Sequence, residues 1–302
     1  MKCIAIRYLV LTSVFAFFFG CSEKQDRTVG KKKTKLKTGY VSVGKTKLYY
    51  QEAGTGQPAI LLHPTLLNHT IWDDQFERFA RDFRIIRYDL RGHGLSLSVP
   101  DTFSHHEDLL KLIKGLSVDK AVLVGLSFGA SVAIDFALEY PERVKALVLV
   151  SPKASGYEFR EMDYLEEAGR LGLAYQEGNL ELVIEMFKKI WVDGPQRNSG
   201  GVDPAVREKI GVIVRENLQH RNPQSIAKSL DPSALARSFR LEIPALIVVG
   251  NLDMTDVKTV SSILERDIDG SQRVIMDNVG HMPNMENPAE FNQIVLDFLS
   301  TL

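Results

Sequence analysis

The 302-residue chain has few cysteines, almost no net charge and no apolar run long enough for a helix that crosses a membrane. Both of its cysteines, Cys3 and Cys21, lie in the first 21 residues, so no disulfide stabilises the rest of the chain. The net charge of −1, without a basic stripe, gives no indication of a nucleic-acid partner. The apolar content of 44% and the charged content of 25% exclude the disordered and collagen-like classes and leave a globular protein.

The start of the chain has the order of parts of a secretion signal. Lys2 and Arg7 precede an apolar run over residues 8–19, which ends on Gly-Cys. This ending resembles a bacterial lipoprotein signal, although two phenylalanines stand where Leu and a small residue are usual. We expect residues 1–20 to be a signal peptide and Cys21 to carry a lipid anchor. The protein would then be held on a membrane of the bacterial cell envelope, facing the periplasm or the exterior. A plain secretory signal or an uncleaved anchor fits the same run.

A polar, lysine-rich stretch over residues 21–38 lacks apolar periodicity, which is typical of a tether. After it, continuous apolar runs alternate with helical patterns, as in strands that are buried on both faces of a parallel sheet. We expect an α/β fold for residues 39–302, with a mostly parallel twisted sheet and helices on both of its faces. The expected strands are a hairpin over 40–54 and the runs 58–65, 83–92, 120–127, 144–152, 243–250 and 271–281.

One interval breaks this alternation. Between Pro152 and Leu241 the pattern is helical and contains no convincing strand. The short run 211–214 is ambiguous, but its charged flanks favour a helix. An insertion after a central strand would lie over the carboxyl ends of the strands, so we expect residues 153–238 to form a helical lid.

Three polar residues follow predicted strands at the place where ligands bind in an open α/β sheet, outside the carboxyl ends of the strands. They are Ser127, Asp253 and His281. A serine hydroxyl is a weak nucleophile that needs a base to take its proton, and the base needs an acid partner that fixes its tautomer. We expect Ser127 to be the nucleophile, His281 the base and Asp253 the orienting carboxylate.

The expected nucleophile lies in a G-x-S-x-G motif between a predicted strand and a predicted helix. With this context, and with the order Ser, Asp, His along the chain, the sequence resembles the α/β-hydrolase superfamily from about residue 38 to its end. The stretch 61–75, with His-Pro in place of the commoner His-Gly, is similar to the 3-oxoadipate enol-lactonase branch, which opens a small enol-lactone without a cofactor. The motifs that carry these resemblances are "LLHPTLLNHTIWDDQ" (61–75), "DLRGHGLS" (89–96), "GLSFG" (125–129), "GNLD" (250–253) and "GHMPNMENPAEFN" (280–292).

Geometry and the resemblance together indicate an oxyanion hole. The backbone N–H after the nucleophile belongs to Phe128, at the start of a helix whose positive end points at the developing charge. The second donor should come from the loop after His63. Pro64 has no N–H, so Thr65 is the expected donor and Leu66 the alternative.

Two of these assignments have competitors. Asp256 is the alternative to Asp253 as the orienting carboxylate, or it caps the helix that follows. His63 and His93 compete with His281 as the base. We expect His63 to order the oxyanion loop, and His93 lies in a turn flanked by glycines.

No metal site and no cofactor is expected. His105 and His106 are adjacent, so they do not share a helix face, and no cluster of histidines and carboxylates completes a site around them. We expect this pair to be a solvated helix start. The aromatic residues of the lid should form mostly its core, and we expect Trp191 and Phe187 to contact the substrate.

These features predict a serine hydrolase that cleaves a small carboxylic ester or lactone through an acyl-enzyme intermediate. A carbon–carbon bond hydrolase with the same triad stays open as an alternative, as does a receptor on this fold that binds without turnover. The complete set of nucleophile, base and carboxylate argues against the receptor, which has no need of it. The only other partner expected is the membrane that holds the lipid anchor.

Overall fold

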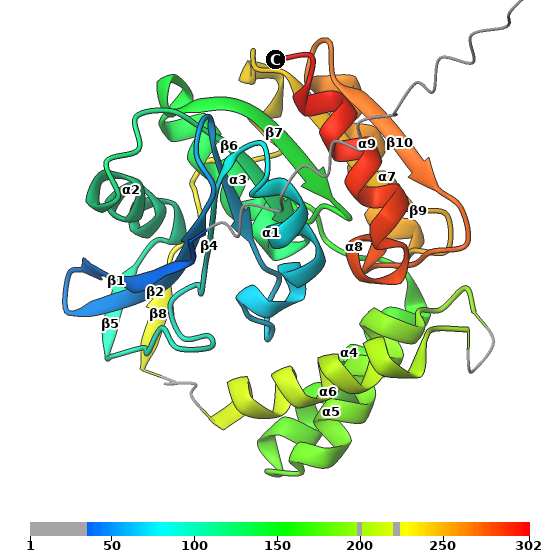
Figure 1. Ribbon diagram of the computed structural model, residues 1–302. Helices are drawn as coiled ribbons and strands as arrows, with labels where there is room; N and C mark the ends of the chain where they lie inside the picture. The colour runs from blue at the N-terminus through cyan, green and yellow to red at the C-terminus, as the bar shows by residue number, and fades with distance from the viewer. Residues whose placement is uncertain (1–34, 198–200, 220–223) are drawn as a thin grey trace, which may run out of the picture. The chain divides into compact units, whose positions relative to one another are not determined.

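A computed structural model describes residues 35–197, 201–219 and 224–302. Its centre is an eight-stranded sheet with the strand order β1-β2-β4-β3-β6-β7-β9-β10 (Figure 1). Strand β2 runs antiparallel to both of its neighbours, and every pairing from β4 to β10 is parallel. The predicted mostly parallel sheet is therefore confirmed.

The predicted strands of this sheet are all present. They are β1 (Lys37–Val43), β2 (Thr46–Ala53), β3 (Pro58–Leu62), β4 (Arg84–Tyr88), β6 (Ala121–Leu126), β7 (Val144–Val150), β9 (Ala245–Gly250) and β10 (Gln272–Met276). Strand β1 begins inside the range predicted as tether, because its first residues pair with β2. Two further strands of three residues, β5 (Asp101–Phe103) and β8 (Ser225–Ala227), pair with each other. The prediction of no strand between Pro152 and Leu241 is therefore wrong at β8.

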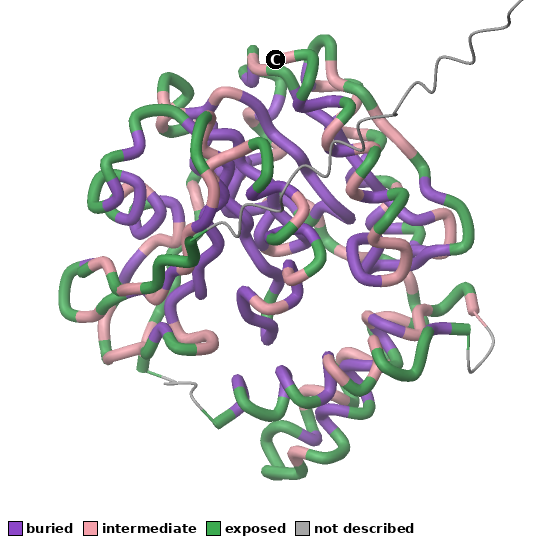
Figure 2. Tube along the Cα trace, viewed as in Figure 1, coloured by how far each residue is buried: buried purple, intermediate pink, exposed green. Residues whose placement is uncertain are grey.

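The central strand β6 shows why the apolar runs are continuous. Val122, Val124 and Leu126 belong to one apolar cluster, whereas Ala121 and Leu123 belong to a second cluster. Successive side chains of a strand point to opposite faces of the sheet, so the two clusters lie on its two faces. The buried residues of the core accordingly gather along the central strands (Figure 2).

Helices cover both faces, as predicted. Helices α1 (Asp73–Phe79) and α9 (Pro288–Leu299) contribute to the first cluster. Helices α2 (His105–Gly115), α3 (Phe128–Glu139) and α7 (Thr255–Asp267) contribute to the second. The short helix α8 (Pro283–Glu286) precedes α9.

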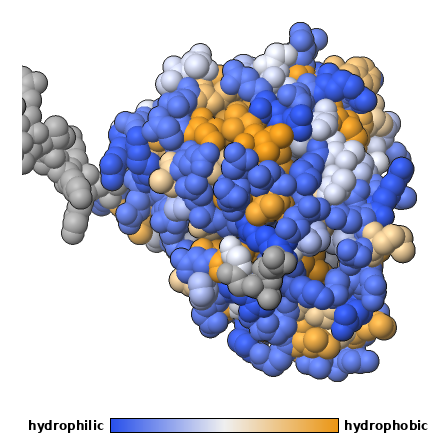
Figure 3. All heavy atoms as spheres, turned by 90° about the vertical axis from the view of Figure 1, so that its right-hand side faces the viewer, coloured by the Kyte–Doolittle hydropathy of each residue, from blue (hydrophilic) through white to orange (hydrophobic). Residues whose placement is uncertain are grey.

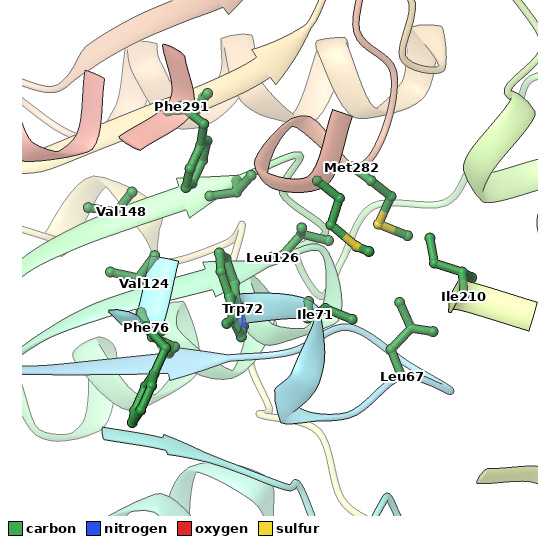
Figure 4. Close-up of a cluster of buried hydrophobic side chains, with 14 of the residues drawn as sticks. Leu67, Ile71, Trp72, Phe76, Val124, Leu126, Val148, Ile210, Met282 and Phe291 are labelled. Carbon is green, nitrogen blue, oxygen red and sulfur yellow. The ribbon is translucent and has the colours of Figure 1, made fainter. Parts of the chain in front are cut away.

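The insertion after β7 is helical. It contains α4 (Met162–Gln176), α5 (Leu180–Lys188), the π-helical turn η3 (Lys189–Asp193) and α6 (Pro204–Gln219). The ambiguous run 211–214 lies inside α6, as expected from its charged flanks. Ile210 of α6 is buried in the first cluster together with Leu67 and Met282, which follow β3 and β10 (Figure 4). The inserted helices therefore pack on the loops at the carboxyl ends of the strands.

The predicted lipid anchor at Cys21 lies outside the described residues. Among the residues that are described, no helix is both long and apolar enough to cross a membrane. The side of the molecule that carries β10 and α9 is largely hydrophilic, with hydrophobic patches between the polar side chains (Figure 3). Ile275 of the edge strand β10 is one of the exposed apolar residues, which are common on folded proteins.

Candidate active site

Ser127 lies at a sharp turn between β6 and α3. Its backbone φ of 53° falls in the left-handed region, which is unusual for a residue with a side chain. The turn is stabilised on both sides, because Ser127 N–H donates to Val150 O at 2.8 Å and Ser131 N–H donates to Ser127 O at 3.1 Å. A strained turn of this kind holds the serine hydroxyl outside the end of the strand, at the amino end of α3.

The two glycines of the G-x-S-x-G motif permit a close approach of backbones. A Cβ atom on Gly125 would lie 2.4 Å from the carbonyl oxygen of Gly129. A Cβ atom on Gly129 would lie 2.3 Å from Leu62 O and 2.9 Å from His63 O. Because neither position has space for a side chain, the start of α3 can lie directly against the end of β3. This contact brings the loop after β3 beside Ser127.

Asp253 and His281 form a buried pair. The carboxylate of Asp253 accepts a hydrogen bond from His281 Nδ1, with distances of 3.0 Å to Oδ1 and 3.1 Å to Oδ2. Asp253 Oδ1 also accepts the N–H of Met254 at 2.8 Å. The side chains are 0% and 4% exposed for Asp253 and His281. A hydrogen-bonded carboxylate at Nδ1 fixes the tautomer that leaves Nε2 free to accept a proton.

An ionic pair holds the loop that carries His281. Glu286 accepts hydrogen bonds from the N–H groups of Gly280 and Met282, the two neighbours of His281. Its carboxylate is paired in turn with the guanidinium of Arg197, and both side chains are nearly fully buried. The sequence motif around His281 includes Glu286, but its partner is 89 residues away and gives no signal in the sequence.

The loop after β3 is ordered by His63, as predicted. His63 Nδ1 donates to Pro64 O at 2.8 Å, and its Nε2 accepts the N–H of Leu90 at 2.9 Å. These two bonds require one ring nitrogen with a proton and one without, so the imidazole is neutral. Complete burial, aided by repulsion from His93, lowers the pKa of His63 to about 3.

Of the two residues predicted to supply the oxyanion hole, Thr65 lines a cavity together with Ser127, and Phe128 follows Ser127 as the first residue of α3. Neither Thr65 N–H nor Phe128 N–H donates a hydrogen bond to another described residue. Leu66, the alternative donor, has a φ of 60°, and its carbonyl oxygen accepts a hydrogen bond from the side chain of Asn217. Because Asn217 belongs to α6, the inserted helices are tied directly to this loop.

The turn at Ser127, the loop that carries His281, the loop after β3 and the insertion all line one cavity of about 470 Å³. Ser127, His281 and Thr65 line it on the side of the sheet, and the predicted contact residues Trp191 and Phe187 line it on the side of the insertion. No hydrogen bond joins the Ser127 hydroxyl to His281 in this structure; in enzymes without substrate such bonds are often long. The cavity is small enough to favour a small molecule.

Comparison with known proteins gives the family. A family model of the alpha/beta hydrolases matches residues 59–294. The chain belongs to the alpha/beta hydrolase family. The predicted membership of the α/β-hydrolase superfamily is therefore confirmed, and with it the prediction that the protein is an enzyme of this fold. Its place in the enol-lactonase branch stays a prediction.

Three relatives show how far the likeness of this hydrolase extends. The pimeloyl-(acyl-carrier protein) methyl ester esterase of Vibrio parahaemolyticus is 28% identical over 267 residues, which cover 84% of this chain and 98% of that protein. A solved carboxylesterase of Bacillus subtilis has a TM-score of 0.71 at 22% identity, covering 88% of this chain and 92% of the other. A solved N-acyl homoserine lactone degrading enzyme has a TM-score of 0.65 at 23% identity, covering 86% of this chain and all of the other. The two solved structures show a common fold only.

Two predictions made from the sequence are wrong, one for Asp256 and one for the pair His105-His106. Asp256 does not cap its own helix, because its carboxylate accepts hydrogen bonds from Tyr157 Oη and from the N–H groups of Arg160 and Glu161. It therefore anchors the chain that leads into the insertion. Burial raises the pKa of Asp256, but these hydrogen bonds outweigh it, and the pKa lies below its usual range.

The pair His105-His106 is not solvated. His106 is 8% exposed, and the ring of His105 contacts those of Phe103 and Phe128 at 4.9 and 5.2 Å. Burial lowers the pKa of His105 to about 3. The start of α2 therefore packs against the start of α3. In the part of the chain that the structure describes, no cluster of three metal-binding side chains is present.

Proposed function

We propose that the protein is a serine hydrolase that cleaves a small carboxylic ester or lactone through an acyl-enzyme intermediate. The observation that carries the proposal is the arrangement around one cavity: Ser127 and His281 line it, and Asp253 binds the far side of the His281 ring. In this proposal the three residues are nucleophile, base and orienting carboxylate.

The first half of the proposed reaction forms the acyl-enzyme. The hydroxyl oxygen of Ser127 attacks the carbonyl carbon while His281 Nε2 takes its proton. The negative charge that develops on the carbonyl oxygen is stabilised by the N–H groups of Thr65 and Phe128. When the tetrahedral intermediate collapses, the bond to the alcohol oxygen breaks and His281 gives its proton to that oxygen.

The second half releases the acid. A water molecule attacks the ester that joins the acyl group to Ser127, and His281 again acts as base. The same two N–H groups stabilise the second tetrahedral intermediate. When it collapses, the bond between the acyl carbon and Ser127 Oγ breaks, His281 returns its proton to that oxygen, and the acid leaves. Asp253 stays ionised throughout and stabilises the positive charge that His281 carries after it takes a proton. For a lactone, the alcohol remains attached to the acyl group, and one ring-opened hydroxy acid leaves.

The relatives support this choice of substrate class. Two of them are named as esterases, one for a methyl ester and one for a carboxylic ester, and the third is named for the degradation of a lactone. The cavity is lined on the insertion side mainly by apolar and aromatic side chains, such as Phe159, Leu171 and Trp191. Such a lining suits a small, largely apolar acyl or alcohol group.

The proposal is tested with the full-length protein in mild detergent. We expect turnover of short-chain p-nitrophenyl esters or of small lactones, and a loss of kcat/KM of at least about 1000-fold in Ser127→Ala. Ser300→Ala, at the exposed end of α9, is the matched control and should keep full activity. Equal activity of Ser127→Ala and the wild type would contradict the proposal. Turnover only of a substrate with a cleavable carbon–carbon bond beside a ketone would favour the alternative reaction.

We also propose that the mature protein begins at a lipidated Cys21 and is held at the bacterial cell envelope. The support is the sequence alone: a basic start, an apolar run and the Gly-Cys ending. Metabolic labelling with a fatty acid should mark the wild type and leave Cys21→Ala unlabelled. Labelling of both proteins, or membrane partition of Cys21→Ala equal to that of the wild type, would contradict lipidation at this position.

A further inference from the structure

One cation lines the cavity beside the predicted nucleophile. Lys153 follows β7, and its backbone N–H donates to Ser127 O at 3.3 Å. Its side chain lines the same cavity as Ser127 and His281. Lys153 is therefore fixed at its backbone next to Ser127, while its side chain reaches into the space where the substrate would bind.

The ammonium group of Lys153 forms no ion pair with an acidic side chain among the described residues, whereas two lysines at the end of α5 and the start of η3 do. Lys188 is paired with Glu185, and Lys189 with Glu167. Glu158 also lines the cavity; like Lys153 it is an exposed residue, and the two side chains do not form an ion pair. Although Lys153 is exposed, the protein atoms around its ammonium group partly displace water and lower its pKa, and no carboxylate of the described chain offsets this effect.

A cation that is partly withdrawn from water without a partner is unfavourable, and an anion placed beside it removes that cost. A hydrogen bond between an ammonium and a carboxylate is among the stronger polar contacts in proteins. Apart from Glu158, the rest of the insertion side is mainly apolar and aromatic, with Phe159 and Trp191 among its residues. The cavity thus combines one reactive serine, an apolar wall and one unpaired cation.

We propose that Lys153 binds a carboxylate of the substrate, so that this hydrolase prefers an ester or lactone that carries a second, free carboxylate group. The inference rests on the proposed function, which assigns the reacting ester to Ser127. In this arrangement the uncharged chain of the substrate lies along the apolar wall. The reacting carbonyl group lies at Ser127, and the free carboxylate accepts hydrogen bonds from Lys153 Nζ.

Two esters of equal acyl length test the proposal, mono-p-nitrophenyl glutarate with a free carboxylate and p-nitrophenyl valerate without one. We expect the ratio of their kcat/KM values, charged to neutral, to fall about 10- to 100-fold in Lys153→Met, mainly through a higher KM for the charged ester. Lys153→Arg keeps the charge and should keep most of the ratio. Lys145→Met removes the same charge near the opposite end of β7 and should leave the ratio unchanged.

The outcomes separate this inference from the proposed function. An unchanged ratio in Lys153→Met, or an equal loss for both esters, would overturn the role of Lys153 and leave the hydrolase intact. If the wild type hydrolyses neither ester, calorimetric titration of Ser127→Ala with glutarate shows whether the cavity binds a carboxylate. If Ser127→Ala binds glutarate and the double variant Ser127→Ala/Lys153→Met does not, Lys153 is supported as a carboxylate site even though the proposed reaction is not observed. Binding that is unaffected, or absent from the start, overturns the inference.

Discussion

The indole ring of Trp191 lies against the imidazole ring of His281, with ring centroids 4.7 Å apart and an angle of 43° between the planes. Trp191 comes from the π-helical turn of the insertion, and its ring also contacts Tyr164 at 5.6 Å and Phe159 at 6.5 Å. The insertion therefore does more than close the cavity. It supplies an aromatic surface that restricts where the proposed base can move.

Loss of this contact should impair the reaction without destroying it. In Trp191→Ala the imidazole gains freedom and the cavity loses apolar wall, so we expect kcat/KM for a short ester to fall about 10-fold or more, with both kcat and KM affected. Trp191→Phe should lie between the wild type and Trp191→Ala. Phe239→Ala, which removes an aromatic ring that is 65% exposed, is the control. Unchanged kinetics of Trp191→Ala would show that the ring contact has no part in the reaction.

Substitution of Asp253 and substitution of Asp256 should have sharply different effects on the kinetics. Asp253→Asn removes the charge that fixes the tautomer of His281, so we expect kcat to fall about 10⁴-fold. Asp256→Asn weakens the anchor on the N–H groups of Arg160 and Glu161, so we expect a smaller effect, mainly a higher KM and a lower unfolding temperature. Steady-state kinetics and thermal unfolding of both variants measure the difference. The reverse order of the two kcat losses would assign the orienting role to Asp256.

The glycine that lets α3 approach β3 should not tolerate a side chain. A Cβ atom on Gly129 would meet two backbone carbonyl oxygens, Leu62 O at 2.3 Å and His63 O at 2.9 Å, and backbone cannot rotate away. We expect Gly129→Ala to lower the free energy of unfolding by about 1 to 3 kcal/mol in urea titration. Gly172→Ala on α4 is the matched control, since a Cβ atom there meets nothing within 4 Å, and it should be neutral or stabilising. Equal effects of the two changes would contradict the close approach.

The sequence predicted the parts of this protein that depend on local pattern. The strands of the main sheet appeared as apolar runs because both faces of β6 and its neighbours are buried. Ser127 was recognisable because a strained turn between strand and helix needs small neighbours, and Gly125 and Gly129 leave a trace in the sequence. Residues at strand ends could be grouped because parallel strands bring their carboxyl ends to one edge of the sheet.

The features that sequence did not predict depend on partners that meet only in the folded chain. Strand β8 has three residues, too few for a periodic pattern, and it exists through its pairing with β5. Asp89 pairs with His69 and Glu286 with Arg197, contacts between residues distant in the chain. His69 and His106 are polar in sequence and buried in the structure, and the ring of His105 packs against Phe128, so composition alone could not place them.

The buried His63 gives the protein a specific sensitivity to acid. Its pKa is about 3 in the folded protein, because burial disfavours the charged ring, against an ordinary value of 6.5 in the unfolded chain. Between these values the unfolded state binds a proton that the folded state does not, so the stability that is present above pH 6.5 is lost as the pH falls. At about pH 4.5 this residue alone should cost about 2 to 3 kcal/mol. Urea unfolding at pH 7 and 4.5 should therefore show a larger loss for the wild type than for His63→Asn, which lacks the titrating ring while keeping His105. Equal losses in the two proteins would mean that His63 takes up its proton in the folded state.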